Sequence, residues 1–249
     1  MHNSISKRIL ESGFECYFVG GCVRDEIIGI KPNDFDLCTN AKPEEICSLF
    51  PNDKVDLVGE SFKVVIVNGI EVATFRKDHY FGGSDKNCVI EYASCITDDL
   101  SRRDLSMNSI AKCARTGKII DPFNGPNDIK NRIIKFTGDP YERILEDPNR
   151  MIRVARFAAK VDGVIELRTA QAIIQSNHLF KNIAKERIAL EILKAMKTKN
   201  ASIFFRSLWE MGLLKDIFPT LHACVGHDGG PYHDEDLFEH MMIAGDYLS

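Results

Sequence analysis

Two aspartates one residue apart, Asp34 and Asp36, are the most suggestive chemical pair in the sequence. We expect a strand over 34–37, on which residues two apart point to the same face. Both carboxylates can then chelate the same metal while Phe35 packs on the other side, which predicts a two-carboxylate Mg²⁺ site. The pair alone is weak evidence, because Asp favours solvated turns.

A Gly-Gly pair lies upstream of the aspartates, after a short apolar run over 17–19. Gly20 and Gly21 carry no Cβ, so backbone N–H groups can approach a phosphate there, and Arg24 can add a charge-assisted contact. A lone Gly-Gly mostly marks a turn without a ligand. The glycine turn and the aspartates together, in the order strand, turn, helix, strand, predict a triphosphate bound with Mg²⁺.

A third carboxylate follows in a predicted hairpin. Two β-branched runs, 64–67 and 70–75, flank Asn68-Gly69, the strongest short hairpin signal that a sequence offers. If the hairpin pairs beside the strand of the aspartates, Glu71 completes a cluster of three carboxylates. Otherwise Glu71 is one exposed strand residue, which is the commoner outcome.

The remaining elements alternate between short helices and strands up to about Gly138 and are helical beyond it. We expect helices over 4–15, 23–28, 42–50 and 100–114, strands over 89–92, 119–120 and 133–136, and a mobile polar loop over 77–87. The predicted domains are a catalytic domain over 1–138, a helical domain over 139–221 and a further helical segment over 222–249.

Three arginines recur every third residue in the predicted helix over 141–160: Arg150, Arg153 and Arg156. Asp147 as N-cap and Pro148 as first helical residue explain the start of this helix without any ligand. The arginines, however, have few acidic partners along their strip, and uncompensated arginines suit a triphosphate or RNA phosphates.

The charge distribution is uneven although the formal net charge is only −4. Residues 150–215 contain thirteen Lys or Arg and five Asp or Glu, a local net charge of +8 that leaves −12 for the remainder. An acidic catalytic part joined to a basic helical part is typical of a metal-dependent enzyme that acts on RNA. A solvated helix face explains the charges equally well.

Composition bounds the class of protein. Hydrophobic residues make up 44% of the chain, which is ample for a packed core. There is no apolar stretch of about 18 residues and no signal peptide pattern, so we expect a soluble cytoplasmic protein without a membrane partner. The eight cysteines include no Cys-x-x-Cys, which favours reduced thiols over a zinc site or disulfides.

Several motifs resemble one family. GGCVRD followed by DFDL is similar to the first motif of the tRNA nucleotidyltransferases (CCA-adding, class II) and bacterial poly(A) polymerases, within the DNA polymerase β-like nucleotidyltransferase superfamily. GIEVATFR, RRDLSMNSIA and EDPNRMIRVARFAAK resemble further motifs of that family, in the same order. The resemblance implies an α+β head, with a small mixed or antiparallel sheet flanked by helices, followed by an all-α neck.

The resemblance also implies roles for individual residues. Asp34 and Asp36 would hold Mg²⁺, and Glu71 would be the third catalytic acid. Arg103 would contact the nucleotide, with Asp104 and Asn108 near its sugar. Further nucleotide contacts would come from the glycine turn and from the arginine helix, where Asp147 and Arg150 would hydrogen-bond the Watson–Crick edge of the base: Gly20, Gly21, Arg24, Asp147, Arg150, Arg153 and Arg156.

The implied activity is template-independent addition of CCA, or of A, to the 3′ end of tRNA from CTP and ATP with release of pyrophosphate. A poly(A) polymerase is the alternative within the class. The final segment, YHDEDLFEHMMIAGDYLS, resembles the opening of an HD metal-phosphohydrolase domain, and an HD phosphohydrolase fragment or an idle RNA-binding module are the other hypotheses. We expect its histidines to be vestigial, truncated or structural.

Overall fold

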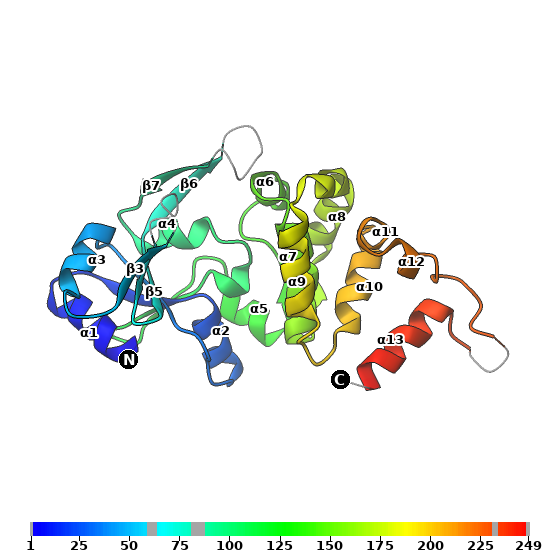
Figure 1. Cartoon of the computed structure of the whole chain (residues 1–249), viewed down its shortest axis with the longest axis horizontal. Helices are drawn as coiled ribbons and strands as arrows, with labels where there is room; N and C mark the ends of the chain where they lie inside the picture. Colours follow the sequence, from blue (N-terminus) through cyan, green and yellow to red (C-terminus); the bar gives the residue numbers. More distant parts are fainter. Residues whose placement is uncertain (1, 59–63, 81–87, 231–233, 248–249) are drawn as a thin grey trace. The chain divides into compact units, whose positions relative to one another are not determined.

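The computed structural model describes residues 2–58, 64–80, 88–230 and 234–247. The chain divides into two compact units, 1–130 and 131–249. In Figure 1 the first unit runs from blue to green and the second from green to red. The first unit combines helices with a sheet and the second is mostly helical. This arrangement confirms the predicted fold class.

The first unit is built on a sheet whose strands lie in the order β3-β4-β5-β2-β1-β8-β9. β2 and β5 are parallel, and the other described neighbours in this sheet are antiparallel. The strands are β1 (Cys16–Val19), β2 (Asp36–Thr39), β3 (Val55–Val58), β4 (Val64–Val67), β5 (Ile70–Thr74), β8 (Ala111–Cys113) and β9 (Ile119–Ile120). A separate ribbon consists of β6 (Arg76–Tyr80) and β7 (Cys88–Tyr92).

Short helices connect these strands. They are α1 (His2–Glu11), α2 (Gly21–Ile28), α3 (Pro43–Leu49), α4 (Ile96–Ser101), the 3₁₀ turn η2 (Ser106–Asn108) and α5 (Gly125–Lys130). The predicted hairpin is confirmed: β4 and β5 are antiparallel, and the turn between them has positive φ at both Asn68 and Gly69. Such a turn matches the twist of the paired strands, which is why Asn-Gly favours it.

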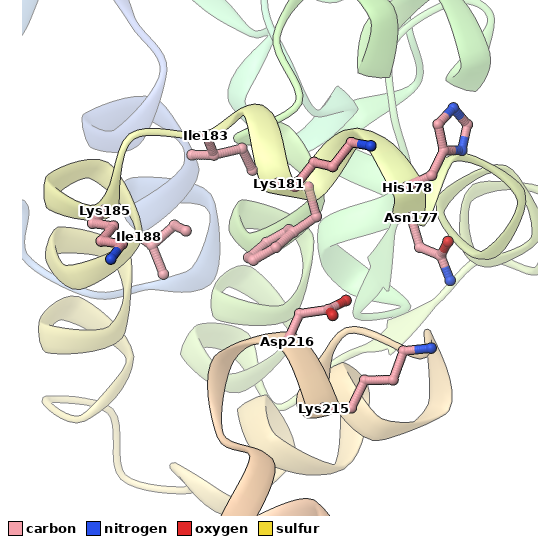
Figure 2. A pocket seen from close by; sticks show the side chains of 9 residues that line it. Asn177, His178, Lys181, Ile183, Lys185, Ile188, Lys215 and Asp216 are labelled. Atoms are coloured by element: carbon pink, nitrogen blue, oxygen red, sulfur yellow. The ribbon is translucent and has the colours of Figure 1, made fainter.

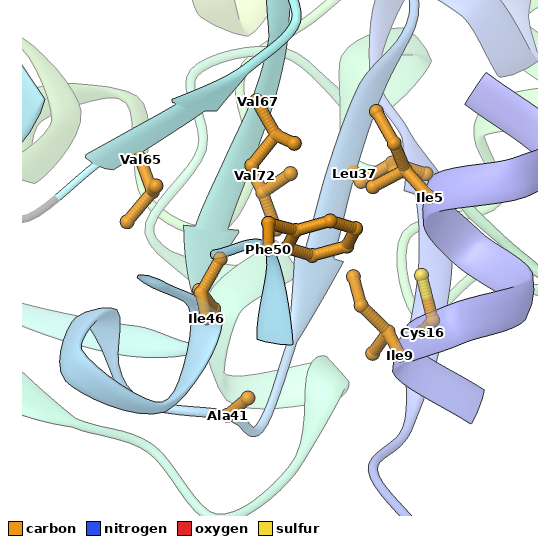
Figure 3. Close-up of a cluster of buried hydrophobic side chains, with 10 residues drawn as sticks. All are labelled: Ile5, Ile9, Cys16, Leu37, Ala41, Ile46, Phe50, Val65, Val67 and Val72. Carbon is orange, nitrogen blue, oxygen red and sulfur yellow. The ribbon is translucent and has the colours of Figure 1, made fainter. Parts of the chain in front are cut away.

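Hydrophobic clusters cover both faces of the sheet. The first joins the strands to α1 and α3 (Figure 3): Ile5, Ile9, Cys16, Leu37, Ala41, Ile46, Phe50, Val65, Val67 and Val72. The second lies on the opposite face: Val19, Cys38, Phe75, Ile96, Leu100 and Ala111. Leu37 and Cys38, adjacent on β2, belong to different clusters, as strand geometry requires. Burying each large aliphatic side chain contributes roughly 1.5–3 kcal/mol, so the two clusters fix the register of β2.

The second unit consists mainly of helices. They are α6 (Pro140–Glu146), α7 (Arg150–Val161), α8 (Leu167–Ser176), the 3₁₀ segment η3 (Asn177–Asn182), α9 (Lys185–Ala195), α10 (Ser202–Glu210), α11 (Leu214–Ile217), α12 (Pro219–His222) and α13 (Leu237–Tyr247). β10 (Ile133–Ile134) and β11 (Val164–Ile165) pair in parallel beside them. Among the described residues, no helix is both long and apolar enough to cross a lipid bilayer.

Two local predictions are wrong. Residues 77–80, expected in a polar loop, belong to β6, because Arg76 and Asp78 pair on its inner side and allow a polar strand to be half-buried. The rest of that predicted loop, 81–87, lies outside the described residues. The predicted helix over 100–114 is replaced by the end of α4, a turn, η2 and β8, because β8 pairs with β1 instead.

Candidate active site

The two aspartates of the predicted metal site lie at the start of β2. The strand begins at Asp36 and not at Asp34, because its antiparallel partner β1 ends at Val19, directly opposite Asp36. Asp34 belongs to the segment that leads into the strand and is exposed, whereas Asp36 is half-buried. Phe35 between them stacks on the ring of His2, with 3.7 Å between ring centroids. This contact ties the segment of Asp34 to α1.

Glu71 lies beside Asp36 in the neighbouring strand. β2 and β5 pair with Asp36 opposite Glu71, so the hairpin does run beside the strand that carries the aspartate. Both side chains share the sheet face of Cys38 and Phe75, since residues two apart on a strand point the same way. The sequence condition for a third carboxylate is therefore met, and the catalytic role of Glu71 stays a prediction.

Burial and neighbouring negative charge act on Asp36 and Glu71. Desolvation raises the pKa of Asp36; the charge of Arg103 lowers it in part, and the nearby charge of Asp34 raises it again. The pKa of Glu71 is also raised, first by desolvation and then by the charge of Asp36. Mutual repulsion of this kind is what a bound cation offsets.

The carboxylates fit Mg²⁺ by the chemistry of their donors. Among the described residues, no three His, Cys, Asp or Glu side chains converge closely enough to enclose a metal by themselves. Mg²⁺ is usually bound through one or two carboxylates and keeps its other positions for substrate phosphates and water. Asp34 and Asp36 supply two carboxylates of that kind.

The glycine turn lies next to Asp36. Val19, the partner of Asp36 in the sheet, is followed directly by Gly20, which has a φ of +68° and is the N-cap of α2. The first N–H groups of α2 thus begin beside the carboxylates, and a helix N-terminus favours anions. The structure brings together the two features on which the sequence prediction depends.

Arg24, expected at the triphosphate, is held inside the first unit. It is 3% exposed, donates to Oδ1 of Asn108 at 2.6 Å and pairs with Asp25 at 2.7 Å. Asn108 in turn donates through Nδ2 to Oδ1 of Asp104 at 3.3 Å. This chain of hydrogen bonds joins α2 to η2 behind the glycine turn, so Arg24, Asp104 and Asn108 brace the turn in this structure.

Arg103 approaches the glycine turn most closely. It leaves the end of α4 in the turn that replaces the predicted helix. A Cβ built on Gly20 would lie 3.1 Å from Nη1 of Arg103. Desolvation raises the pKa of Asp36 and of Glu71, and the positive charge of Arg103 opposes that rise in both. Arg103, the glycine turn and the carboxylates therefore form one site in the first unit.

The remaining predicted residues lie in the second unit. Asp147 is not the N-cap of the arginine helix: it follows α6, and its Oδ1 accepts from the N–H of Asn149, which precedes α7. Pro148 is not helical, because the chain turns between the two helices. The apolar side chains of α7 are buried: Met151, Ile152, Ala155, Ala158 and Ala159.

The three arginines of α7 are compensated, contrary to the prediction. Arg150 pairs with Glu146, whereas Arg153 and Arg156 both pair with Glu191 of α9. The prediction considered only acidic residues on the same face of the helix as the arginines. Glu191 comes from a different helix and is 4% exposed. Its position on the apolar stripe of α9, with Ile188 and Ala195, is the sequence signal that was missed.

A second residue of α9 was missed as well. Arg187 pairs with Oδ2 of Asp147 at 2.7 Å. Of the two predicted base-reading residues, α9 thus contacts Asp147 through Arg187, whereas Arg150 is paired with Glu146 of α6.

A hollow of about 470 Å³ lies elsewhere in the second unit, between η3, the start of α9 and α11 (Figure 2). Its lining combines apolar and cationic side chains: Asn177, His178, Phe180, Lys181, Ile183, Lys185, Ile188, Lys215 and Asp216. Lys185 lies at one end, and Lys215 and His178 at the other, with Lys181 between them. Positive charges spread along a hollow suit an extended anion better than a single phosphate.

The histidines near the end of the chain form no metal site within the described residues. Nδ1 of His240 lies 3.0 Å from Glu235, and Asp236 accepts from the backbone N–H groups of Gly226 and Glu239. Asp236 thus orders the start of α13. His233 lies outside the described residues.

Two family models match the chain. Residues 16–135 match the poly(A) polymerase head domain, and residues 164–225 match the probable RNA- and SrmB-binding site of polymerase A. A CCA-adding enzyme of Ligilactobacillus salivarius is 41% identical over 199 residues, 79% of this chain and 49% of that protein. Poly(A) polymerase I of Haemophilus influenzae is 35% identical over 254 residues, 97% of this chain and 55% of that protein.

A solved structure gives the same result. The crystal structure of the Bacillus stearothermophilus CCA-adding enzyme in complex with CTP has a TM-score of 0.77 and 34% identity, and covers 85% of this chain and 52% of that one. The chain thus spans about half the length of the proteins that it matches.

Fold and site define a nucleotidyltransferase-type head, followed by a helical segment that matches the probable RNA- and SrmB-binding site of polymerase A. The chain belongs to the family of tRNA nucleotidyltransferases and bacterial poly(A) polymerases. The resemblance noted in the sequence motifs is confirmed.

Proposed function

We propose that the protein is a template-independent RNA nucleotidyltransferase that adds CCA, or A, to the 3′ end of tRNA from CTP and ATP and releases pyrophosphate. The observation that carries this proposal is the pairing of Asp36 with Glu71 across β2 and β5, with the Gly20 turn directly beside it. Acidic groups next to an anion-binding turn are what a metal-bound triphosphate requires.

The first unit would bind the triphosphate. Asp34 and Asp36 would hold Mg²⁺, which supplies activation of the RNA 3′-hydroxyl and charge neutralisation at the departing pyrophosphate. The N–H groups at Gly21 and beyond would bind phosphate oxygens, and Arg103 would add its positive charge. Glu71 would add to the negative field that attracts the cation.

The second unit would select the base. Asp147 offers carboxylate acceptors and Arg150 a fork of donors, and together these can pair with the Watson–Crick edge of either cytosine or adenine. Arg187 and Glu146 hold the two side chains, so their orientation is fixed before the nucleotide binds. Arg153 and Arg156 would contribute further contacts while sharing Glu191.

RNA would bind to the basic surface of the second unit. The hollow of Figure 2 lies within the segment that matches the RNA-binding model. Its lysines suit phosphates, and its apolar side chains, among them Phe180, suit a base. We accordingly assign 1–138 to catalysis, 139–221 to nucleotide selection and RNA binding, and 222–249 to the start of a further helical segment. A cytoplasmic location is part of the same proposal.

A poly(A) polymerase is the second candidate, supported by the similarity to the Haemophilus influenzae enzyme over 97% of this chain. Product analysis separates the two functions. The protein is incubated with Mg²⁺, CTP and ATP and either a tRNA that lacks its 3′ CCA or an unstructured RNA, and the products are sequenced. Defined C-C-A or A addition to tRNA supports the first function, and long A tails on either RNA support the second. Unchanged RNA contradicts both.

A further inference from the structure

Asp99 of α4 is a fully buried carboxylate that the sequence predictions left without a role. Its side chain has 0% exposure. Burying a carboxylate is costly unless charge and hydrogen bonds compensate it. The groups that compensate the charge of Asp99 therefore indicate its role.

Those partners are two consecutive arginines. Oδ2 of Asp99 accepts from Nε and Nη2 of Arg103 at 3.2 and 3.0 Å. Oδ1 accepts from Nε of Arg102 at 2.9 Å and, at 3.4 Å, from the backbone N–H of Arg76. One carboxylate thus holds the turn after α4 against the start of β6.

The geometry leaves Arg103 aimed in one direction. Because Nε and Nη2 of Arg103 face Asp99, its third nitrogen, Nη1, lies toward the glycine turn, 3.1 Å from where a Cβ on Gly20 would stand. Two hydrogen bonds from one edge of a planar guanidinium fix its orientation, whereas a single hydrogen bond would leave it free to rotate.

We propose that Asp99 is a positioning residue for nucleotide binding: it fixes the guanidinium of Arg103 at the glycine turn, where the triphosphate binds. This role rests on the proposed function, because it requires a nucleoside triphosphate at that turn. Asp99 itself does not touch the nucleotide and acts only through Arg103.

The test is a double-mutant cycle on nucleotide affinity, measured by calorimetry with CTP, ATP and Mg²⁺ on the full chain. Asp99→Asn keeps the shape of the side chain but loses its charge and half of its acceptors, so we expect affinity to fall about tenfold or more. Adding Asp99→Asn to Arg103→Met should cause no further loss, since the two residues act as one unit. The proposal is overturned if the fold-losses in affinity of the two single variants multiply in the double variant. It is also overturned if the Asp99→Asn protein folds and binds with wild-type affinity.

The matched control is Asp98→Asn. Asp98 is the neighbouring carboxylate of α4, pairs with Lys77 at 3.2 Å on the surface, and lies outside the site. Its replacement should leave affinity within about twofold of wild type, because surface ion pairs contribute little. An equal loss in Asp98→Asn and Asp99→Asn would show a general effect of charge in α4 and overturn the proposal.

Arg103→Lys decides the question if Asp99→Asn does not fold. Lysine keeps the positive charge, but its single nitrogen cannot donate to Asp99 from two positions as the guanidinium does. An affinity as low as that of Arg103→Met supports positioning, whereas wild-type affinity overturns it. A wild-type protein that binds no triphosphate overturns the proposed function and this role together; normal wild-type binding with an unaffected Asp99→Asn overturns only the role of Asp99.

Discussion

Nη1 of Arg103 lies 3.1 Å from the position that a Cβ on Gly20 would occupy. Two features therefore favour glycine at position 20. Its φ is +68°, and the side chain of Arg103 fills the space that a Cβ would need. The sequence alone explains this glycine by the approach of a phosphate. The structure adds that the turn and Arg103 are packed together, so a change at either should be felt at the other.

Gly20→Ala should lower both stability and nucleotide affinity. Positive φ costs an alanine about 1–2 kcal/mol, and the new methyl group must also displace Arg103. Gly29→Ala is the matched control, because Gly29 has a φ of +85° with nothing within 4 Å of its Cβ position. Both variants should lose stability in thermal melts, Gly20→Ala the more because it must also displace Arg103, and only Gly20→Ala should bind CTP or ATP more weakly. Equal affinities in the two variants would show that the packing against Arg103 has no effect on binding.

Asp36→Asn should stabilise the protein at neutral pH while removing its activity. The folded state raises the pKa of Asp36 above its ordinary value of 3.8, so the folded state binds the proton more tightly than the unfolded chain does. The stability that this group contributes is present below pH 3.8 and is lost as pH rises through the folded pKa. Replacing the ionised group at pH 7 therefore removes the cost of desolvating its charge and the repulsion from Asp34, and thermal melting without Mg²⁺ should show a higher Tm.

Asp53→Asn provides the contrast. Asp53 is hydrogen-bonded to Arg8 and Asn68 on the surface, so its loss should lower the Tm slightly. A lower Tm for Asp36→Asn would contradict the crowding of charges at this site.

The raised pKa values of Asp36 and Glu71 also predict how Mg²⁺ binding depends on pH. Mg²⁺ needs Asp36 ionised, so acidification should weaken Mg²⁺ binding at a higher pH than for ordinary carboxylates.

Glu191→Gln should destabilise the second unit strongly. Glu191 is 4% exposed and pairs with Arg153, Arg156 and Lys194, so its loss removes a buried negative charge that compensates the guanidinium groups. Breaking such a buried pair from one side costs about 3 kcal/mol or more. The exposed Glu186 of the same helix is the control, and Glu186→Gln should change the free energy of unfolding by less than about 0.5 kcal/mol. Urea denaturation measures both, and equal effects would refute the special role of Glu191.

The lysines of the hollow should govern RNA affinity. Replacing Lys181, Lys185 or Lys215 with alanine should weaken binding of tRNA and reduce the slope of log affinity against log salt by about 0.7–0.9 for each phosphate that is no longer neutralised. Lys7→Ala, which removes an exposed lysine of α1 in the first unit, should leave the slope unchanged. Filter binding at several salt concentrations provides the data. Unchanged slopes in all three hollow variants would place RNA elsewhere.

In the first unit the sequence predicted a local turn better than it predicted long-range strand pairing. The Asn-Gly signal placed the β4–β5 hairpin correctly, because it depends on local geometry. The pairing of Glu71 with Asp36 is a long-range contact that the sequence left open. The helix expected over 100–114 failed, since RRDLSMNSIA has no local signal for the pairing of β8 with β1, which is a long-range interaction. Propensity cannot decide such a segment, because tertiary pairing overrides it.

The charge pairing of α7 was not predictable from its own strip of residues. Glu191 follows Arg156 by 35 positions and reaches it only after the chain turns back through α8 and η3. Arg187 and Asp147 are likewise 40 positions apart. Patterns within one helix identify which side chains are charged. The partner of each charge depends on how the helices pack.

The most direct test of the proposed catalytic centre is the rate at which labelled CMP and AMP enter a tRNA that lacks its 3′ CCA, compared between the wild-type protein, Asp36→Asn and Asp98→Asn. We predict Mg²⁺-dependent incorporation by the wild type, a comparable rate for Asp98→Asn, and a loss on the order of 1,000-fold for Asp36→Asn, because removal of a metal-binding carboxylate takes away several kcal/mol of transition-state stabilisation. Incorporation by Asp36→Asn at the wild-type rate, or none by the wild type, would contradict the proposed catalytic centre.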